Sequence, residues 1–355
     1  MTVIIGIDPH KRSHTAVALD EHDEQLDELR VVAERRQVQR LLAWAARWPD
    51  RLWAIENANG LGWLLSRQLV DAGEQVRDVP PKLSAEVRKL SGSGHKTDAH
   101  DAHSTAIAGR RAKVLRPVVP DGTPQLLGVL VERRWHIVDT RQKTLVRIHE
   151  QLVKLIEGGC SRQLSATKVA KLLRNIRPTD DVTARRRQVV KELLADLRRL
   201  DKQRKQINAE LDQALADYGT SLTDIDGIGR VAAATIIAIV GDVRRFPTEA
   251  HFASFSGTAP VAASSGEKVR YRLNLDGQRQ VNKVLHTAAK VQTGMAGSDG
   301  RAYVHRKLAE GKTRREATRS LKRHLANVVY RALQADLANK QVSGEDRQVR
   351  ESSSR

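Results

Sequence analysis

The sequence predicts an α/β domain at the N-terminus that is followed by a larger, mainly helical part. Three observations support this fold class. Short apolar runs alternate with amphipathic segments over residues 1–120, which is typical of a sheet covered by helices. Residues 121–220 have the spacing of long helices, and a glycine-rich turn opens residues 221–340. The length of 355 residues is enough for two domains and a connector.

The N-terminal domain, residues 1–120, alternates predicted strands and helices. The helix over 98–111 has a suitable N-cap in Thr97, since a threonine hydroxyl accepts a hydrogen bond from the first turn. Strands are predicted over 3–8, 15–19, 51–56 and 75–79, and helices over 38–48, 60–73 and 98–111.

The connector, residues 121–220, is predicted to contain two long helices. The segment 124–157 is one amphipathic stretch, and 158–183 has no clear pattern. In 185–218 apolar residues alternate at spacings of three and four from Val190 to Ala214, with one polar break at Arg204. This seam fits a coiled coil between chains, which would give helix-mediated dimers. It fits equally a hairpin with 124–157 inside one chain.

Residues 221–340 form the predicted C-terminal domain. Its turn at 225–229, followed by a helix over 230–240, is similar to the hairpin of helix-hairpin-helix modules. There Gly227 and Gly229 would let backbone N–H groups approach a phosphate, although a plain tight turn has the same composition. A loop of small residues, 257–266, comes next. The last segment, 341–355, is predicted to be a disordered tail.

The charge is distributed unevenly along the chain, whose formal net charge is +19. Residues 1–120 carry 18 basic and 16 acidic side chains, whereas 268–323 carry 15 basic and only 4 acidic ones. Ordinary surfaces mix both signs, so this excess favours a polyanionic partner over simple solubilisation, and nucleic acid is the default. Only 12 residues are aromatic, which argues against a single-strand binder built on stacked rings.

The single cysteine and the absence of a long apolar run argue against several other classes of protein. Cys160 is the single cysteine, so a disulfide framework and a multi-cysteine zinc site are excluded, and a reducing compartment is expected. Neither a signal peptide nor a membrane span is visible in the sequence. We therefore expect a cytoplasmic protein.

Four carboxylates are the candidate chemical site. Asp8 and Glu56 each end a predicted strand, and Asp98 and Asp101 project from one face of a predicted helix at spacing i, i+3. Such a set of hard oxygen ligands suits Mg²⁺, and two such ions can flank a scissile phosphate. An acid that ends a first strand, followed by a turn and a second strand, is the opening of RNase H-like nucleases. The nearby histidines, His10 among them, lack a recognised zinc-protease spacing, which favours supporting or phosphate contacts.

Two blocks of motifs resemble one insertion-sequence transposase family. The first block lies at 5–8, 55–56 and 96–102, and the second at 225–229, 239–247, 253–260 and 264–266. In order and spacing they are similar to the DEDD domain and the C-terminal transposase domain of the family described as bridge-RNA-guided recombinases. The resemblance covers about residues 3–335.

This resemblance implies a mechanism that composition alone does not reveal. It implies a Holliday-junction-resolvase-like RNase H fold whose acids, here Asp8, Glu56, Asp98 and Asp101, bind Mg²⁺. It also implies a serine nucleophile that forms a phosphoserine link to DNA, and Ser265 holds that place, with Ser264 leaving the register open by one. Family members work as multimers, with acids from one protomer and the serine from another, and a structured noncoding RNA pairs with donor and target DNA.

Contacts to nucleic acid are expected just after the serine loop. The family often has a Lys-Arg-Gly-Asn type turn there, whereas this chain has a less basic turn over 275–280. The four residues that we expect to touch DNA, or equally the guide RNA, are Arg270, Arg272, Arg279 and Lys283.

Two other functions remain open at this stage. A metal-dependent junction resolvase would use the four acids alone, with Ser265 in a structural role. A non-catalytic nucleic-acid binder would rest on the basic C-terminal part, but it leaves a set of carboxylates unexplained beside a polyanion that they would repel.

Overall fold

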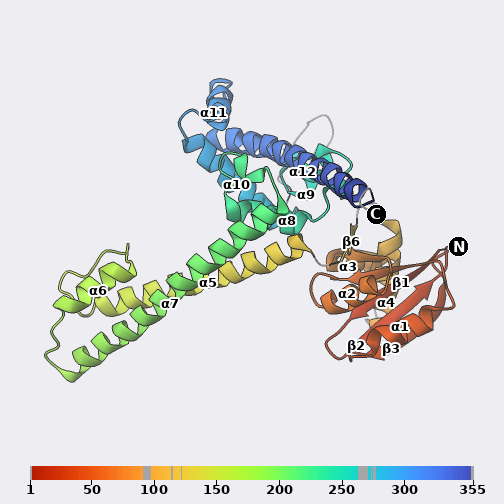
Figure 1. Cartoon of the computed structure of the whole chain (residues 1–355), viewed down its shortest axis with the longest axis horizontal. Helices are drawn as coiled ribbons and strands as arrows, with labels where there is room; N and C mark the ends of the chain where they lie inside the picture. The colour runs from red at the N-terminus through yellow and green to blue at the C-terminus, as the bar shows by residue number, and fades with distance from the viewer. Residues whose placement is uncertain are drawn as a thin grey trace. The chain divides into compact units, whose positions relative to one another are not determined.

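The computed structural model describes residues 2–90, 97–112, 115–120, 122–262, 271–272, 274 and 277–352. The chain divides into two compact units, Met1–Gly122 and Thr123–Arg355 (Figure 1). Ser264, Ser265 and Arg270 lie outside the described residues.

The first unit is built on a six-stranded mixed sheet with the strand order β3-β2-β1-β4-β5-β6. The first three strands are antiparallel, β4 and β5 then run parallel to β1, and β6 is antiparallel to β5. This is the topology of RNase H-like domains, so the predicted fold class is confirmed for this unit. The strands are β1 Val3–Pro9, β2 Ser13–Leu19, β3 Gln25–Val32, β4 Arg51–Glu56, β5 Val76–Val79 and β6 Arg116–Pro117.

The two faces of the sheet are covered by different helices, and β1 shows how its residues are divided between them. Val3, Ile5 and Ile7 belong to an apolar core that includes residues of α1 and α2, whereas Ile4 belongs to a second core with residues of α3 and α4. Because side chains alternate along a strand, Gly6 and Asp8 face the same side as Ile4. The helices are α1 Gln37–Ala45, α2 Trp63–Asp71, α3 Pro81–Leu90 and α4 Asp98–Arg111.

Three elements of this unit are not predicted from the sequence, namely β3, α3 and β6, which is only two residues long. Strand β3 is an edge strand whose side chains are mostly exposed or half-buried, so it lacks the apolar run that marks a strand. Helix α3 begins at Pro81, because proline fits the first turn of a helix, where its missing N–H is not needed.

Helix α4 lies unusually close to β1, and Gly6 makes this approach possible. A Cβ built on Gly6 would overlap the carbonyl oxygen of Ala102 and lie 2.5 Å from the backbone nitrogen of Ala106. Both neighbours are helix backbone atoms, which cannot move aside as a flexible side chain can. A similar contact joins Gly109 to the side chain of Ala54 on β4.

The second unit begins with a helical hairpin, α5 against α7, with α6 packed at its far end. Arg134 donates to Asn208 at 2.9 Å, and Arg141 donates to Asp201 at 2.7 Å, so the two helices run antiparallel. These three helices are α5 Thr123–Leu152, α6 Ala166–Asn175 and α7 Asp181–Tyr218.

The apolar seam of α7 is buried inside this chain. Val190 and Leu197 pack with residues of α5 and α6, and Leu200 and Ile207 pack with Ile137 of α5. Of the two interpretations of the seam, the intramolecular hairpin is therefore the one that the structure has. The seam no longer argues for dimers.

The base of the hairpin shares one apolar core with the remaining helices. Leu127 of α5 and Leu211 of α7 are fully buried in the core that includes Ile236, Phe252 and Leu285. The hairpin and the C-terminal helices therefore form one packed unit. The remaining elements are η1 Leu222–Asp224, α8 Arg230–Val240, η2 Val243–Arg245, α9 Glu249–Phe255, β7 Val261–Ala262, β8 Tyr271–Arg272, α10 Arg279–Gly294, α11 Asp299–Ala309 and α12 Arg314–Ser352.

Helix α12 continues to Ser352, where the sequence predicted a disordered tail over 341–355. This segment contains no proline and only one glycine, so its residues are compatible with a continued helix.

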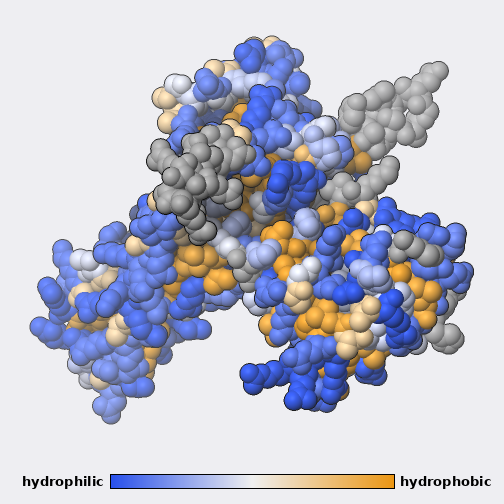
Figure 2. Space-filling model, turned by 45° about the vertical axis from the view of Figure 1, so that its right-hand side comes forward, coloured by the Kyte–Doolittle hydropathy of each residue, from blue (hydrophilic) through white to orange (hydrophobic). Residues whose placement is uncertain are grey.

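None of the helices in the described residues is long and apolar enough to cross a lipid bilayer. Hydrophilic residues cover most of the surface visible in Figure 2.

Replacing Gly6 by alanine tests the contact between β1 and α4. We expect Gly6→Ala to lower the free energy of unfolding of the first unit by about 1–3 kcal/mol, because the new methyl group meets helix backbone. Urea unfolding followed by hydrogen exchange of peptides from α4 would measure the loss. Gly294→Ala is the control, since a Cβ at Gly294 meets nothing within 4 Å. Equal exchange in wild type and Gly6→Ala would contradict the prediction.

Candidate active site

Asp8 and Glu56 lie at the same edge of the sheet. Strands β1 and β4 are parallel neighbours with Ile7 opposite Ile55, so the residues that follow these two are adjacent register positions. The carboxyl ends of parallel strands meet at one edge, and here β4 ends in Glu56 and β1 has Asp8 as its next-to-last residue. The predicted pairing of these two strand-end acids agrees with this register.

The first turn of α4 supplies the other two acids. The Thr97 hydroxyl accepts a hydrogen bond from the His100 backbone N–H at 3.2 Å, and this cap starts the helix at Asp98. Asp98 and Asp101 both lie in that first turn, where the helix dipole favours negative charge. Because Gly6 lets α4 lie close to β1, this turn is near Asp8.

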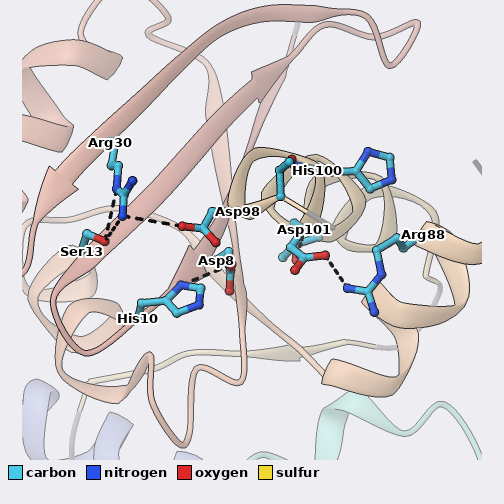
Figure 3. Close-up of polar contacts among 10 residues, drawn as sticks. Asp8, His10, Ser13, Arg30, Arg88, Asp98, His100 and Asp101 are labelled. Atoms are coloured by element: carbon cyan, nitrogen blue, oxygen red, sulfur yellow. Dashed lines mark hydrogen bonds and ion pairs between the residues drawn. The ribbon is translucent and has the colours of Figure 1, made fainter. Parts of the chain in front are cut away.

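Asp8, His10 and Asp98 form a cluster that could hold a metal ion. Each residue offers one ligand atom, and the three atoms lie within 4.8 Å of one another (Figure 3). The His10 Nδ1 atom is 3.4 Å from Asp8 Oδ2. Sequence reasoning gave His10 a supporting role and did not place it among the ligands. The sequence signal that could have identified His10 as a ligand is its position two residues after Asp8.

The electrostatics of Asp8 fit a bound cation. The pKa of Asp8 is raised to about 6, mainly by burial; His10 lowers it, and the charges of Glu56, Asp101 and Asp98 contribute to the rise. The Oδ2 atom of Asp8 is buried and makes no hydrogen bond among the described residues. A buried carboxylate oxygen without a donor is costly, and a divalent cation would satisfy it. The residues present therefore fit a hard divalent metal.

Arginines hold two of the acids in this structure. Arg88 of α3 forms an ion pair and hydrogen bond with Asp101, whose carboxylate is directed toward it in Figure 3. Arg30 of β3 lies 3.8 Å from Asp98. Of the four predicted acids, Asp8 and Asp98 thus share the cluster, Glu56 acts on it through its charge, and Asp101 is engaged by Arg88.

The segment with the candidate serines joins two short antiparallel strands. Val261 of β7 pairs with Arg272 of β8, and Ala262 pairs with Tyr271, so the chain leaves along β7 and returns along β8. Ser264 and Ser265 stand between these strands in the sequence, outside the described residues. Their role stays a prediction.

The base of this two-stranded element is tightly built. A Cβ on Gly277 would overlap the backbone of Gly257, so two glycines allow the outgoing and returning chain to touch. Asn282 of α10 donates to the carbonyl oxygens of Ser256 at 2.9 Å and Gly257 at 2.8 Å. The Gln278 N–H also donates to the Phe255 carbonyl at 2.6 Å.

The glycines of the predicted phosphate-binding turn have different surroundings. Gly227 has a φ of +80°, and a Cβ there would lie 2.9 Å from the Ala288 carbonyl oxygen of α10, so packing explains this glycine. Gly229 is the N-cap of α8, and a Cβ there would meet nothing within 4 Å. Arg279 and Lys283 lie on α10 and Arg272 on β8, and contact of these residues with nucleic acid stays a prediction.

Removing the Asp8 charge should stabilise the metal-free protein. The pKa of Asp8 is 3.8 in the unfolded chain and about 6 in the folded one, so its contribution to stability is present below pH 3.8 and is lost as the pH rises through 6. We expect Asp8→Asn in EDTA to raise the free energy of unfolding by about 1–3 kcal/mol at neutral pH and by nearly nothing below about pH 4. Urea unfolding across this pH range is the measurement.

Glu21→Gln is the matched control for this change, since Glu21 is exposed and follows the end of β2 that pairs with Ile4, whereas Asp8 pairs with Thr15 near the other end of β2. Mg²⁺ or Mn²⁺ should stabilise the wild type and not Asp8→Asn, because binding to the folded state alone shifts the unfolding equilibrium. A variant that keeps the wild-type pH dependence would disprove the assignment.

Comparison with known proteins is consistent with this geometry. A family model of DEDD transposases, described as "Transposase", matches residues 5–156, and one described as "Transposase IS116/IS110/IS902 family" matches 219–305. The IS116 44.8 kDa protein of Streptomyces clavuligerus is 27% identical over 93% of this chain and 94% of its own length. The transposase of the IS1328 element of Yersinia enterocolitica is 26% identical, with 94% of each chain covered.

A solved structure is also similar to part of the chain. RuvC of T. thermophilus in complex with a Holliday junction substrate is 16% identical with a TM-score of 0.28, and the match covers 33% of this chain and all of that one. The two family matches occur in the order that the motif blocks predicted. From these matches over both units, the chain belongs to the DEDD-type family of insertion-sequence transposases related to IS110 and IS116.

Proposed function

We propose that this transposase cuts and rejoins DNA through a covalent phosphoserine intermediate, with Mg²⁺ held by its acids and with an element-encoded RNA as guide. The observation that carries the metal-dependent part is the cluster of Asp8, His10 and Asp98 around a buried carboxylate oxygen without a donor. The strongly basic segment 268–323 of the other unit supports a nucleic-acid substrate.

The acids have a defined part in this proposal. Asp8 and Asp98 would hold the metal together with Glu56, and Asp101 would join them on leaving Arg88. Bound Mg²⁺ would supply Lewis-acid stabilisation of the charge that develops on the phosphate oxygens.

The serine supplies the nucleophile. The Ser265 hydroxyl would attack the phosphorus, form a Ser–O–P ester and release one deoxyribose hydroxyl, with the serine proton passing to the leaving oxygen or to water. The number of phosphate ester bonds is conserved, so a hydroxyl of the exchanged strand can reverse the step without an external energy source. Ser264 is the neighbouring position that the test has to separate from Ser265.

The partners follow from the family resemblance and from charge. We expect donor DNA, target DNA and a structured noncoding RNA that determines sequence by base pairing. We also expect a homo-oligomer, a dimer or a tetramer, in which acids of one protomer act with the serine of another. The contacts expected from Arg270, Arg272, Arg279 and Lys283, and from Gly227 and Gly229, belong to this proposal.

A second candidate is a metal-dependent junction resolvase. One observation favours it, namely that the cluster found among the described residues, Asp8, His10 and Asp98, comes entirely from the first unit. In that case the acids cleave with water as nucleophile, and Ser265 is structural.

Covalent trapping tests the proposal. Protein is mixed with Mg²⁺, DNA of the element ends and RNA transcribed from the element's flanks, and a denaturing gel is then run. We expect a protein–DNA adduct in the wild type and in Ser264→Ala. Ser265→Ala should give less adduct by at least about a hundredfold, because it removes the nucleophile. Asp8→Ala should reduce the amount of adduct to a similar extent.

The other outcomes decide between the alternatives. An adduct that is lost only in Ser264→Ala moves the nucleophile by one position. Metal-dependent nicking without adduct, equal in both serine variants and absent in Asp8→Ala, would establish the resolvase. DNA binding with neither nicking nor adduct, with the element's own RNA present and with Asp8→Ala unchanged, would leave the non-catalytic binder. Omitting the RNA from a reaction that forms adduct tests the guide.

A further inference from the structure

A basic cavity of about 540 Å³ lies in the second unit beside β7 and β8. One wall is made by residues 257–260, which lead into β7, and by Arg272 of β8. The opposite wall is made by Tyr303 of α11 and by one side of α12. The cavity is therefore lined by described residues that precede and follow the candidate serine segment in the chain.

The lining of this cavity is strongly cationic. Five Lys or Arg residues line it against one carboxylate, Glu316. That carboxylate is used locally, since Glu316 Oε2 accepts from the Thr313 backbone N–H at 2.8 Å and from the Thr313 hydroxyl at 2.7 Å, which caps the start of α12. The five cations are Arg272, Lys312, Arg319, Lys322 and Arg323.

Lys322 is held in place without a carboxylate. Its Nζ donates to Asn282 Oδ1 at 3.0 Å, and the same Asn282 donates to the carbonyls of Ser256 and Gly257. Burial lowers the pKa of Lys322, and the charge of Arg319 lowers it further. Among the described residues this half-buried ammonium forms no ion pair and stands beside like charges, so a bound anion would relieve the repulsion.

Two rings stand at the same cavity. Tyr303 and His324 both line it and are in edge-to-face contact, with their centroids 4.7 Å apart and their planes at 67°. Burial lowers the pKa of His324, and the nearby Arg323 lowers it further, so this imidazole is neutral at neutral pH. Rings next to cations suit a ligand with a base or sugar beside its phosphate.

We infer that this cavity binds a DNA strand by one of its phosphodiesters, with Arg319 and Lys322 as the principal cations. This inference rests on the proposed function in one respect. The cavity adjoins β7 and β8, between which the proposed nucleophile stands in the sequence, and this favours the strand to be cut over the guide RNA. The α12 cations were not among the contacts predicted from the sequence.

Equilibrium binding in the Ser265→Ala background and in EDTA tests the inference without any chemistry. The probes are a fluorescein-labelled single-stranded DNA of mixed sequence and an RNA of the same sequence, followed by anisotropy over a series of salt concentrations. The variant is Arg319→Ala with Lys322→Met, and the matched control is Arg314→Ala with Arg315→Ala, which removes the same charge from exposed α12 residues outside the cavity.

We expect the cavity variant to raise the Kd for DNA about tenfold and to reduce the salt slope by about 0.7, as for the loss of one phosphate contact on single-stranded DNA. The control should change the Kd less than twofold. Equal losses in both variants would show a diffuse basic surface and overturn the site. A loss confined to the RNA probe would overturn the assignment to DNA.

Arg319→Ala alone keeps the test valid should the double variant unfold, because Arg319 is exposed. It should raise the Kd for DNA severalfold with the melting temperature unchanged. An unchanged Kd in this variant would also overturn the site. Because binding is measured without cleavage, failure of the covalent-trapping experiment does not affect this result.

Discussion

The close contact between Gly6 and α4 is the constraint on which the candidate active site depends. Asp8 and Gly6 face the same side of β1, and a strand whose residue 6 had any side chain would hold α4 farther away. The first turn of α4, with Asp98 and Asp101, would then lie farther from Asp8. The same absence of a Cβ at Gly109 lets the C-terminal half of the helix approach Ala54. Helix position, and with it the spacing of the carboxylates, is therefore set by backbone packing.

The electrostatics of the carboxylate cluster suit a divalent cation. Burial and three neighbouring carboxylates act against the ionised form of Asp8, while His10 and the arginines of β3 and α3 offset part of the repulsion. Arg88 pairs with Asp101 and Arg30 lies near Asp98, so side chains of α3 and β3 offset part of the negative charge of the acids.

In the second unit, too, glycines allow a close backbone contact, here beside the two-stranded element β7–β8. Gly257 and Gly277 let the outgoing and returning chain touch, and Asn282 and Lys322 extend this contact from α10 to α12. The base of the serine segment is thereby fixed to the same helices that line the basic cavity.

The sequence by itself determined the fold class of the first unit, the strand-end positions of Asp8 and Glu56, and the helix that begins at Asp98, because apolar periodicity and capping are local signals. It missed the edge strands β3 and β6 and helix α3, since neither edge strand has an apolar run and a Pro-Pro pair also marks a turn. It could not choose between a coiled coil and a hairpin, because the same seam serves both and only the partner, α5, decides. The participation of His10, the engagement of Asp101 by Arg88 and the cavity on α12 depend on contacts between distant segments, and only the tertiary structure brings those segments together.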